Sequence, residues 1–329
     1  MTKQAGDRRA RPLSRVDLRA RTQPASAPWD KTLQSWNPIV VVVPAILGAG
    51  GSVLLLQINA DATTSSARFI ESAGFPLWAA IIGAQTAVWA VITVPLWREI
   101  ISTYRATKPS WSIWLVPAFV VAALAALAVL SPAREAPWPL WGHHLKAWTL
   151  TAAAAIGVGV PAIFGIAIVQ DRVRRHEPVK LTERDIERAL DARAQMKRFL
   201  GIAGAVISLA VLASGALRLA TVPEFIEESQ FPASSVLLYG VFFTALLLIV
   251  YVPAHLSLRR LCLDIREHFF PGEAMPPPTS AEFAAWVDGR NRLDTLTQVN
   301  VTAGQQVQAS IFILAPLLSG LLGALLPAL

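Results

Sequence analysis

The chain has 329 residues, of which 54% are hydrophobic and 16% are charged, and its formal net charge at pH 7 is +7. Soluble domains carry about a quarter of their residues as Asp, Glu, Lys or Arg, so this composition excludes a water-soluble enzyme and a disordered chain. The single cysteine, Cys262, excludes a disulfide-rich secreted fold. We therefore expect an all-α integral membrane protein.

Seven apolar stretches are long enough to cross a bilayer, which requires about 20 apolar residues in a helix. The connecting segments on one side of these stretches hold 25 of the 29 Lys and Arg residues. Basic residues accumulate in cytoplasmic loops, so the sequence predicts a polytopic protein with its N-terminus inside and its C-terminus outside. The predicted spans are residues 37–57, 75–97, 111–131, 147–170, 199–220, 233–254 and 307–329.

Residues 1–36 precede the first span and hold eight basic residues among Pro, Ser and Ala. They contain no apolar core of the kind found in signal peptides. We expect a disordered cytoplasmic arm that is attracted to anionic lipid headgroups. Nucleic-acid binding is disfavoured because aromatic residues are not interleaved with the basic ones. The chain is rich in Ala and Arg and poor in Lys, which is typical of high-GC bacteria and favours a bacterial cytoplasmic membrane.

An internal repeat is indicated by two related outer segments. Residues 69–76 (FIESAGFP) and 225–232 (FIEESQFP) are identical at five of eight positions, and each leads into a span that runs inward. We interpret residues 37–131 and 199–329 as parallel three-helix repeats. Residues 132–170, an outer loop and the fourth span, would invert the chain between them, in a 3+1+3 arrangement.

Prolines occupy corresponding positions in the two repeats. Pro95 and Pro253 lie near the inner ends of spans two and six, and Pro117 and Pro316 follow similar sequences in spans three and seven. Interrupted helices at equivalent places in two halves are a pointer to a binding site or a hinge; the alternative is a static kink inherited by duplication. Polar residues in mid-span that would line such a site are Gln85, Thr86, Tyr239 and Thr244.

Two acidic residues, Glu71 and Glu227, occupy the same position of the repeated outer segment. If the repeat axis passes close to both loops, their carboxylates would gather a cation at the outer mouth; solvated side chains or helix caps are the alternative. The adjacent His143 and His144 point apart on a helix, so we expect no metal site there. The sequence contains no catalytic motif and no cofactor fingerprint, so we expect neither enzyme activity nor a bound cofactor.

Two cytoplasmic segments are expected to have structure of their own. A capping box at Thr182 predicts a charged helix within residues 171–198, and a second one at Thr279 predicts a helix within residues 276–298. The latter lies in the loop 255–306, which has no long counterpart in the first repeat. These segments would dock on the rest of the chain or on a cytoplasmic protein partner.

Two functions are left open by these patterns. The first is a transporter or pore for a neutral or weakly polar small solute, with its site between the two three-helix units. The second is a non-transporting membrane subunit or anchor that binds or regulates a cytoplasmic partner. A membrane-disrupting effector ranks third because no sensing domain is visible. Stripes of small residues on spans four and seven favour close helix packing, within one chain or in a homo-oligomer.

Overall fold

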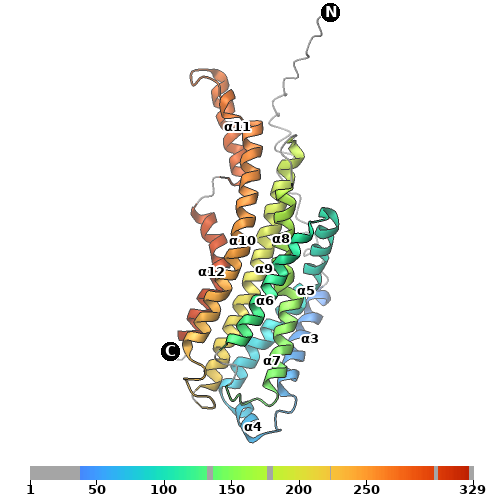
Figure 1. Ribbon diagram of the computed structural model, residues 1–329, viewed down its shortest axis with the longest axis vertical. Helices are drawn as coiled ribbons and strands as arrows, with labels where there is room; N and C mark the ends of the chain where they lie inside the picture. The colour runs from blue at the N-terminus through green and yellow to red at the C-terminus, as the bar shows by residue number, and fades with distance from the viewer. Residues whose placement is uncertain (1–37, 132–135, 176–180, 223, 300–302, 326–329) are drawn as a thin grey trace, which may run out of the picture. The chain divides into compact units, whose positions relative to one another are not determined.

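Figure 1 shows the computed structural model of the chain, which describes residues 38–131, 136–175, 181–222, 224–299 and 303–325. The regular structure in these residues is helical throughout, without a β-strand, which confirms the all-α class predicted from the sequence. Residues 42–329 form one compact unit and residues 1–41 another; the packing described below is that of residues 42–329. The predicted basic arm, residues 1–36, lies outside the described part of the chain.

The described elements are all helical. In order they are α3 (Pro38–Gln57), α4 (Thr64–Glu71), α5 (Gly74–Thr107), η1 (Trp111–Trp114), α6 (Leu115–Leu130), α7 (His143–Ala154), η3 (Ala155–Gly159), α8 (Val160–Arg174), α9 (Glu183–Thr221), α10 (Ala233–Phe269), η5 (Gly272–Ala274), α11 (Ala281–Thr297) and α12 (Ala303–Leu325).

Five helical stretches of the described chain are long and apolar enough to cross a membrane, and two shorter apolar helices, Val41–Gln57 and Ile311–Ala324, accompany them. These helices indicate a multi-pass membrane protein. The count of seven spans, their orientation and the 3+1+3 repeat stay predictions. The five long stretches are Gly74–Thr107, Trp111–Leu130, His143–Arg174, Glu183–Thr221 and Ala233–Ala274.

Helices α9 and α10 are much longer than a membrane requires. They contain 39 and 37 residues, and at a rise of about 1.5 Å per residue each is roughly twice as long as the hydrocarbon core is thick. Their apolar parts match the predicted spans 199–220 and 233–254. The remaining turns, which carry most of the charges of these two helices, therefore extend out of the apolar region.

The second half of the fourth predicted span, α8, is buried inside the bundle. All nine residues from Pro161 to Val169 of α8 are buried, and α8 packs against α5, α6, α9 and α10. A helix that is apolar on all sides belongs in an interior. Gly165 allows the closest approach, because a Cβ atom there would lie 2.8 Å from the ring of Phe199 in α9.

A π-helical segment, η3, joins α7 to α8. Pro161 has no N–H, so the regular donor to the Gly157 carbonyl one turn earlier is missing. The indole N–H of Trp97, from α5, donates to that carbonyl at 3.1 Å. The irregular turn is therefore held by a neighbouring helix, which is how proline is accommodated in membrane helices.

Glycines bring α9, α10 and α12 into backbone contact. A Cβ atom on Gly240 of α10 would lie 2.6 Å from the Pro316 carbonyl oxygen of α12, and one on Gly215 of α9 would lie 2.6 Å from the Cα of Gly323. Such close contacts gain dispersion energy that lipid chains cannot match. α6, by contrast, packs mainly on α8, so the third helices of the two predicted repeats have different surroundings.

Replacement of Gly240 by Ala should destabilise the protein by about 1–3 kcal/mol, because the added methyl group overpacks the α10–α12 contact. The matched control is Gly51→Ala in α3, where a Cβ atom would meet nothing within 4 Å and where Ala is the better helix former. Unfolding of the purified protein in detergent measures both. Equal midpoints for the two variants would contradict the packing described here.

Candidate functional site

Two polar side chains of α5 are buried without partners inside the apolar helices. Gln85 is 4% exposed and Trp89 is 6% exposed. In the described part of the chain, neither Oε1 of Gln85 nor the indole N–H of Trp89 has a hydrogen-bond partner. Leaving such groups unpaired in an apolar interior costs on the order of 1–3 kcal/mol each. The two residues are one helical turn apart, so an acceptor and a donor lie on one face of α5.

The face that carries these groups packs against the centre of the bundle. Trp89 belongs to a core cluster with Val158 of η3, Ala162 of α8 and Ala203 of α9. The next turn of α5 contributes Thr93, whose Oγ1 would lie 3.5 Å from a Cβ atom on Gly157. The unpaired donor therefore lies close to the π-helical segment, and irregular turns of this kind are frequent at functional sites.

Thr86, the neighbour of Gln85, serves helix packing. Its hydroxyl lies 2.9 Å from the Gly48 carbonyl oxygen and 2.9 Å from Oγ of Ser52, both in α3. A Cβ atom on Gly48 would lie 2.6 Å from the Thr86 carbonyl oxygen, so α3 and α5 are in close contact here. Successive residues of a helix point about 100° apart, which separates Thr86 from the Gln85 face.

The two polar candidates of α10 differ from each other. Tyr239 is hydrogen-bonded through its hydroxyl to Ser131, the residue that ends α6. Thr244 is 7% exposed, and among the described residues its hydroxyl has no hydrogen-bond partner. Of the four polar residues predicted from sequence, Gln85 and Thr244 thus keep unsatisfied groups, whereas Thr86 and Tyr239 are bonded to different helices.

Of the two predicted proline pairs, Pro95 and Pro253 lie at similar places inside long helices, whereas Pro117 and Pro316 do not. Pro95, Pro253 and Pro316 lie inside α5, α10 and α12. Pro117 is the third residue of α6, directly after η1. The N–H groups of a first helical turn lack intrahelical acceptors, so proline is tolerated there without breaking the helix. A hinge is consequently better supported at the three interior prolines than at Pro117.

The two related outer segments lie side by side. The rings of Phe69 and Phe225, which are equivalent in the repeated motif, pack edge to face with centroids 5.4 Å apart. Glu71 ends α4 and is exposed, and Glu227 is exposed in a turn. Among the described residues, no group of three or more His, Cys, Asp or Glu side chains is placed to hold a metal ion.

An ion pair that was not predicted from the sequence holds the second outer segment, residues 225–232, against α9. Arg218 of α9 is only 3% exposed; it donates through Nε to the Phe231 carbonyl oxygen at 3.0 Å and through Nη2 to Glu228. The acid with a structural role is therefore Glu228, not its neighbour Glu227. The burial of Arg218 between apolar residues was the available signal, because a cation that deep in a span requires a partner.

Lys146 is a second buried cation with a defined role. It is 5% exposed, and its Nζ donates to the Leu56 and Ile58 carbonyl oxygens at 3.0 and 2.7 Å. These carbonyls lie at the C-terminal end of α3, where a helix has acceptors without intrahelical donors and its dipole favours positive charge. Lys146 thus ties the start of α7 to the end of α3.

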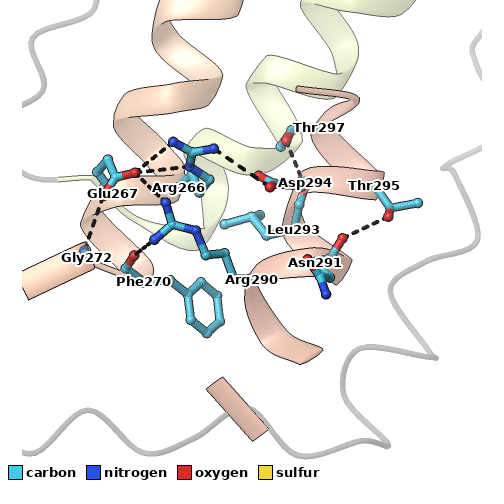
Figure 2. Close-up of polar contacts among 10 residues, drawn as sticks. All are labelled: Arg266, Glu267, Phe270, Gly272, Arg290, Asn291, Leu293, Asp294, Thr295 and Thr297. Atoms are coloured by element: carbon cyan, nitrogen blue, oxygen red, sulfur yellow. Dashed lines mark hydrogen bonds and ion pairs between the residues drawn. The ribbon is translucent and has the colours of Figure 1, made fainter. Parts of the chain in front are cut away.

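At the opposite end of the bundle, a polar network docks α11 on α10 (Figure 2). Oε1 of Glu267 accepts from Arg266 and from Arg290, at 2.8 Å each, and Arg290 also donates to the Phe270 carbonyl oxygen at 2.9 Å. These contacts lie beyond the apolar part of α10. The hydrogen bond from Arg266, together with one from the Gly272 N–H and the charge of Arg290, lowers the pKa of Glu267.

Apolar contacts complete the docking of α11. Gly289 lies against Phe270, since a Cβ atom there would be 2.5 Å from its ring, and Leu293 is 5% exposed. The helix begins at Ala281 with Ser280 as its N-cap, one residue later than the predicted cap at Thr279. The glycine that interrupts the apolar pattern is therefore the point of closest approach between α11 and the end of α10.

No protein-family model, no curated protein and no solved structure matches this chain. Function is consequently argued from the geometry above.

Glu228→Gln should lower the stability of the protein by roughly 1–2 kcal/mol, because it leaves the buried Arg218 without its charged partner while Glu228 itself is partly exposed. Glu227→Gln is the matched control, since it removes the same charge from the adjacent residue and should leave the unfolding midpoint unchanged. Unfolding in detergent at low salt measures both. A larger loss of stability for Glu227→Gln than for Glu228→Gln would show that the contact with Arg218 is wrongly assigned to Glu228.

Proposed function

We propose that the chain is a seven-span membrane transporter or pore for a small uncharged solute that both donates and accepts hydrogen bonds. The observation that carries this proposal is the pair of buried, unpartnered groups on one face of α5, Oε1 of Gln85 and the indole N–H of Trp89. A hydroxyl or amide group of a solute would satisfy both, accepting from Trp89 and donating to Gln85. Polar groups inside spans are costly, and they commonly mark a pathway.

The surroundings of the pair support the same function. Ionisable side chains do not accompany it on the predicted mid-span stretch of α5, so the site selects neither an anion nor a cation. The adjacent η3 segment and the interior proline Pro95 interrupt regular helical bonding on either side of the contact. Such interruptions supply places where helices bend, and we include Pro95, Pro253 and Pro316 as hinge positions in the proposal.

The test is flux through purified protein in liposomes, with glycerol and urea as uncharged probes. Gln85→Leu and Trp89→Phe should each reduce flux at least about tenfold, because a lost hydrogen bond to the solute costs on the order of 1.5 kcal/mol. The stability of Gln85→Leu should be unchanged or increased, since it removes an unsatisfied buried group; Trp89→Phe also removes such a group but loses packing in the core, so its stability should fall modestly. Trp148→Phe, at an exposed indole, is the matched control.

Two results would reject this function. Wild-type protein that carries neither probe faster than empty liposomes would exclude the proposed solute class. Variants at Gln85 and Trp89 that keep wild-type flux would show that the unpaired groups belong to helix packing, not to a pathway.

A second function, a membrane anchor for a cytoplasmic protein, is favoured by α11. This helix is docked by the network of Figure 2, and its opposite side is polar and exposed, at residues that include Asp288, Asn291 and Thr295. The first half of the chain has only 13 residues at the corresponding place, 98–110. α11 is thus an addition to the membrane unit rather than part of it.

Native mass spectrometry of the protein released from its own membrane in lipid nanodiscs tests the anchor function. A stoichiometric second polypeptide should be present, and replacement of residues 276–298 by a Gly-Ser linker should remove it while the unfolding midpoint of the membrane helices is kept. The substitution Arg105→Gln, at an exposed residue outside both predicted docking segments, serves as a control. Wild-type protein without a second polypeptide would argue against the anchor and leave transport as the function.

A further inference from the structure

Basic side chains on the two sides of the cytoplasmic part of α9 have different kinds of partner. On one side, Arg198 forms an ion pair with Glu99 of α5 at 3.4 Å. On the other side, Arg193 and Lys197 both donate to a single neutral acceptor, Oε1 of Gln298, at 3.2 and 3.3 Å. Within the described residues, neither Arg193 nor Lys197 has a carboxylate at ion-pair distance. Two positive charges therefore share one amide oxygen.

Further titratable groups face the same place from α10. The cation Arg259 lies one turn from His255, and burial together with the charges of Arg193 and Arg259 lowers the pKa of His255, so this imidazole adds no positive charge at neutral pH. Arg193 also repels Lys197. The other polar groups facing Arg193 from α10 are the thiol of Cys262 and the hydroxyl of Tyr251, which is 3.4 Å from Nδ1 of His255. This group of side chains thus has surplus positive charge.

The side chain of Gln298 is held in place by the backbone. Gln298 ends α11 in the left-handed conformation, with φ of +48°, which costs a non-glycine residue on the order of 1 kcal/mol. Its backbone N–H bonds to the carbonyl oxygens of Asp294 and Thr295, and the next residue, Val299, is buried. The amide oxygen is thereby fixed between the two cations of α9 that it accepts from.

The position along the helices suggests what supplies the missing negative charge. Arg193 and Lys197 directly precede the apolar part of α9, which begins near Phe199, and His255 directly follows the apolar part of α10. This transition from apolar to charged residues is the depth at which phospholipid headgroups lie. Lys197 is exposed and Arg193 is half-buried, so a headgroup can reach both.

We propose that Arg193, Lys197 and the Gln298 side chain form a binding site for the phosphate group of an anionic phospholipid. A phosphate offers several anionic oxygens, which suit the guanidinium of Arg193 and the ammonium of Lys197 better than one amide oxygen does. The residues of this site are not those of the N-terminal arm, residues 1–36, for which attraction to headgroups is predicted from sequence. It does not depend on whether the chain transports a solute.

Lipid titration followed by native mass spectrometry tests the site, with the full-length protein and phosphatidylglycerol or phosphatidylcholine as probes. The double variant Arg193→Gln, Lys197→Gln should bind the tightest phosphatidylglycerol about tenfold or more weakly, since each basic contact at a membrane surface contributes on the order of 1 kcal/mol. The charge-matched control, Arg188→Gln with Arg292→Gln, neutralises two exposed cations and should bind as wild type does. Equal weakening of phosphatidylglycerol binding in both double variants would show that the lipid is attracted by the overall charge of the protein and not by this site, and it would overturn the proposal.

A second variant keeps both cations. Gln298→Glu places a carboxylate between them, so it should raise the unfolding midpoint and still remove the tight phosphatidylglycerol. Retention of that lipid by Gln298→Glu would overturn the proposal even if the double variant folded poorly. A final arm separates the sources of phosphate: inorganic phosphate at millimolar concentration should fail to displace the lipid, and displacement would assign the site to a soluble phosphate instead.

Discussion

Inside a membrane, each backbone carbonyl that loses its own helical donor needs another partner, and this constraint shapes the bundle around its prolines. Pro161 leaves the Gly157 carbonyl without its regular donor, and the indole of Trp97 supplies one from α5. Pro316 likewise has no N–H to donate to the Phe312 carbonyl, four residues earlier. This carbonyl lies against Gly204 of α9. At Pro161 the freed carbonyl therefore requires that a neighbouring helix, α5, comes close enough to donate to it.

α8, which the repeat interpretation treats as part of the linker between the two halves, is buried inside the bundle. The residues of α8 that pack against protein are as apolar as residues of other helices that face lipid, so hydropathy predicts that a span exists and not what surrounds it. The pattern around Pro161 and Gly165 indicates close packing, and the structure shows its partners: Trp97 in one case and Phe199 in the other. Neighbours of this kind are a property of the folded bundle.

The sequence predicts local features of this protein better than its candidate sites. The start of α9 follows from the capping box that Thr182 forms with Asp185. The structure begins α11 within two residues of Thr279, but its N-cap Ser280 makes no side-chain cap hydrogen bond, so the predicted capping box at Thr279 is not formed. Gln85 could be singled out because an amide in a span is unusual, whereas Trp89 could not, because most tryptophans in spans only pack. Glu227 is singled out by the repeated motif, but the motif does not indicate that its neighbour Glu228 contacts Arg218; which of two adjacent acids reaches a buried cation depends on the turn between them.

Polar groups with partners in the chain and polar groups without them have different meanings here. Arg218, Lys146 and Arg198 are each matched by a carboxylate or by carbonyls of the same chain, so their energetic role is complete when the protein folds. Gln85, Trp89 and the Arg193–Lys197 pair are not matched in that way. Folding alone does not offset the free-energy cost of burying such groups without partners or of placing like charges close together. A ligand that supplied the missing donor, acceptor or negative charge would offset that cost, and the chemistry lacking at each place is therefore the basis of the ligand proposed for it.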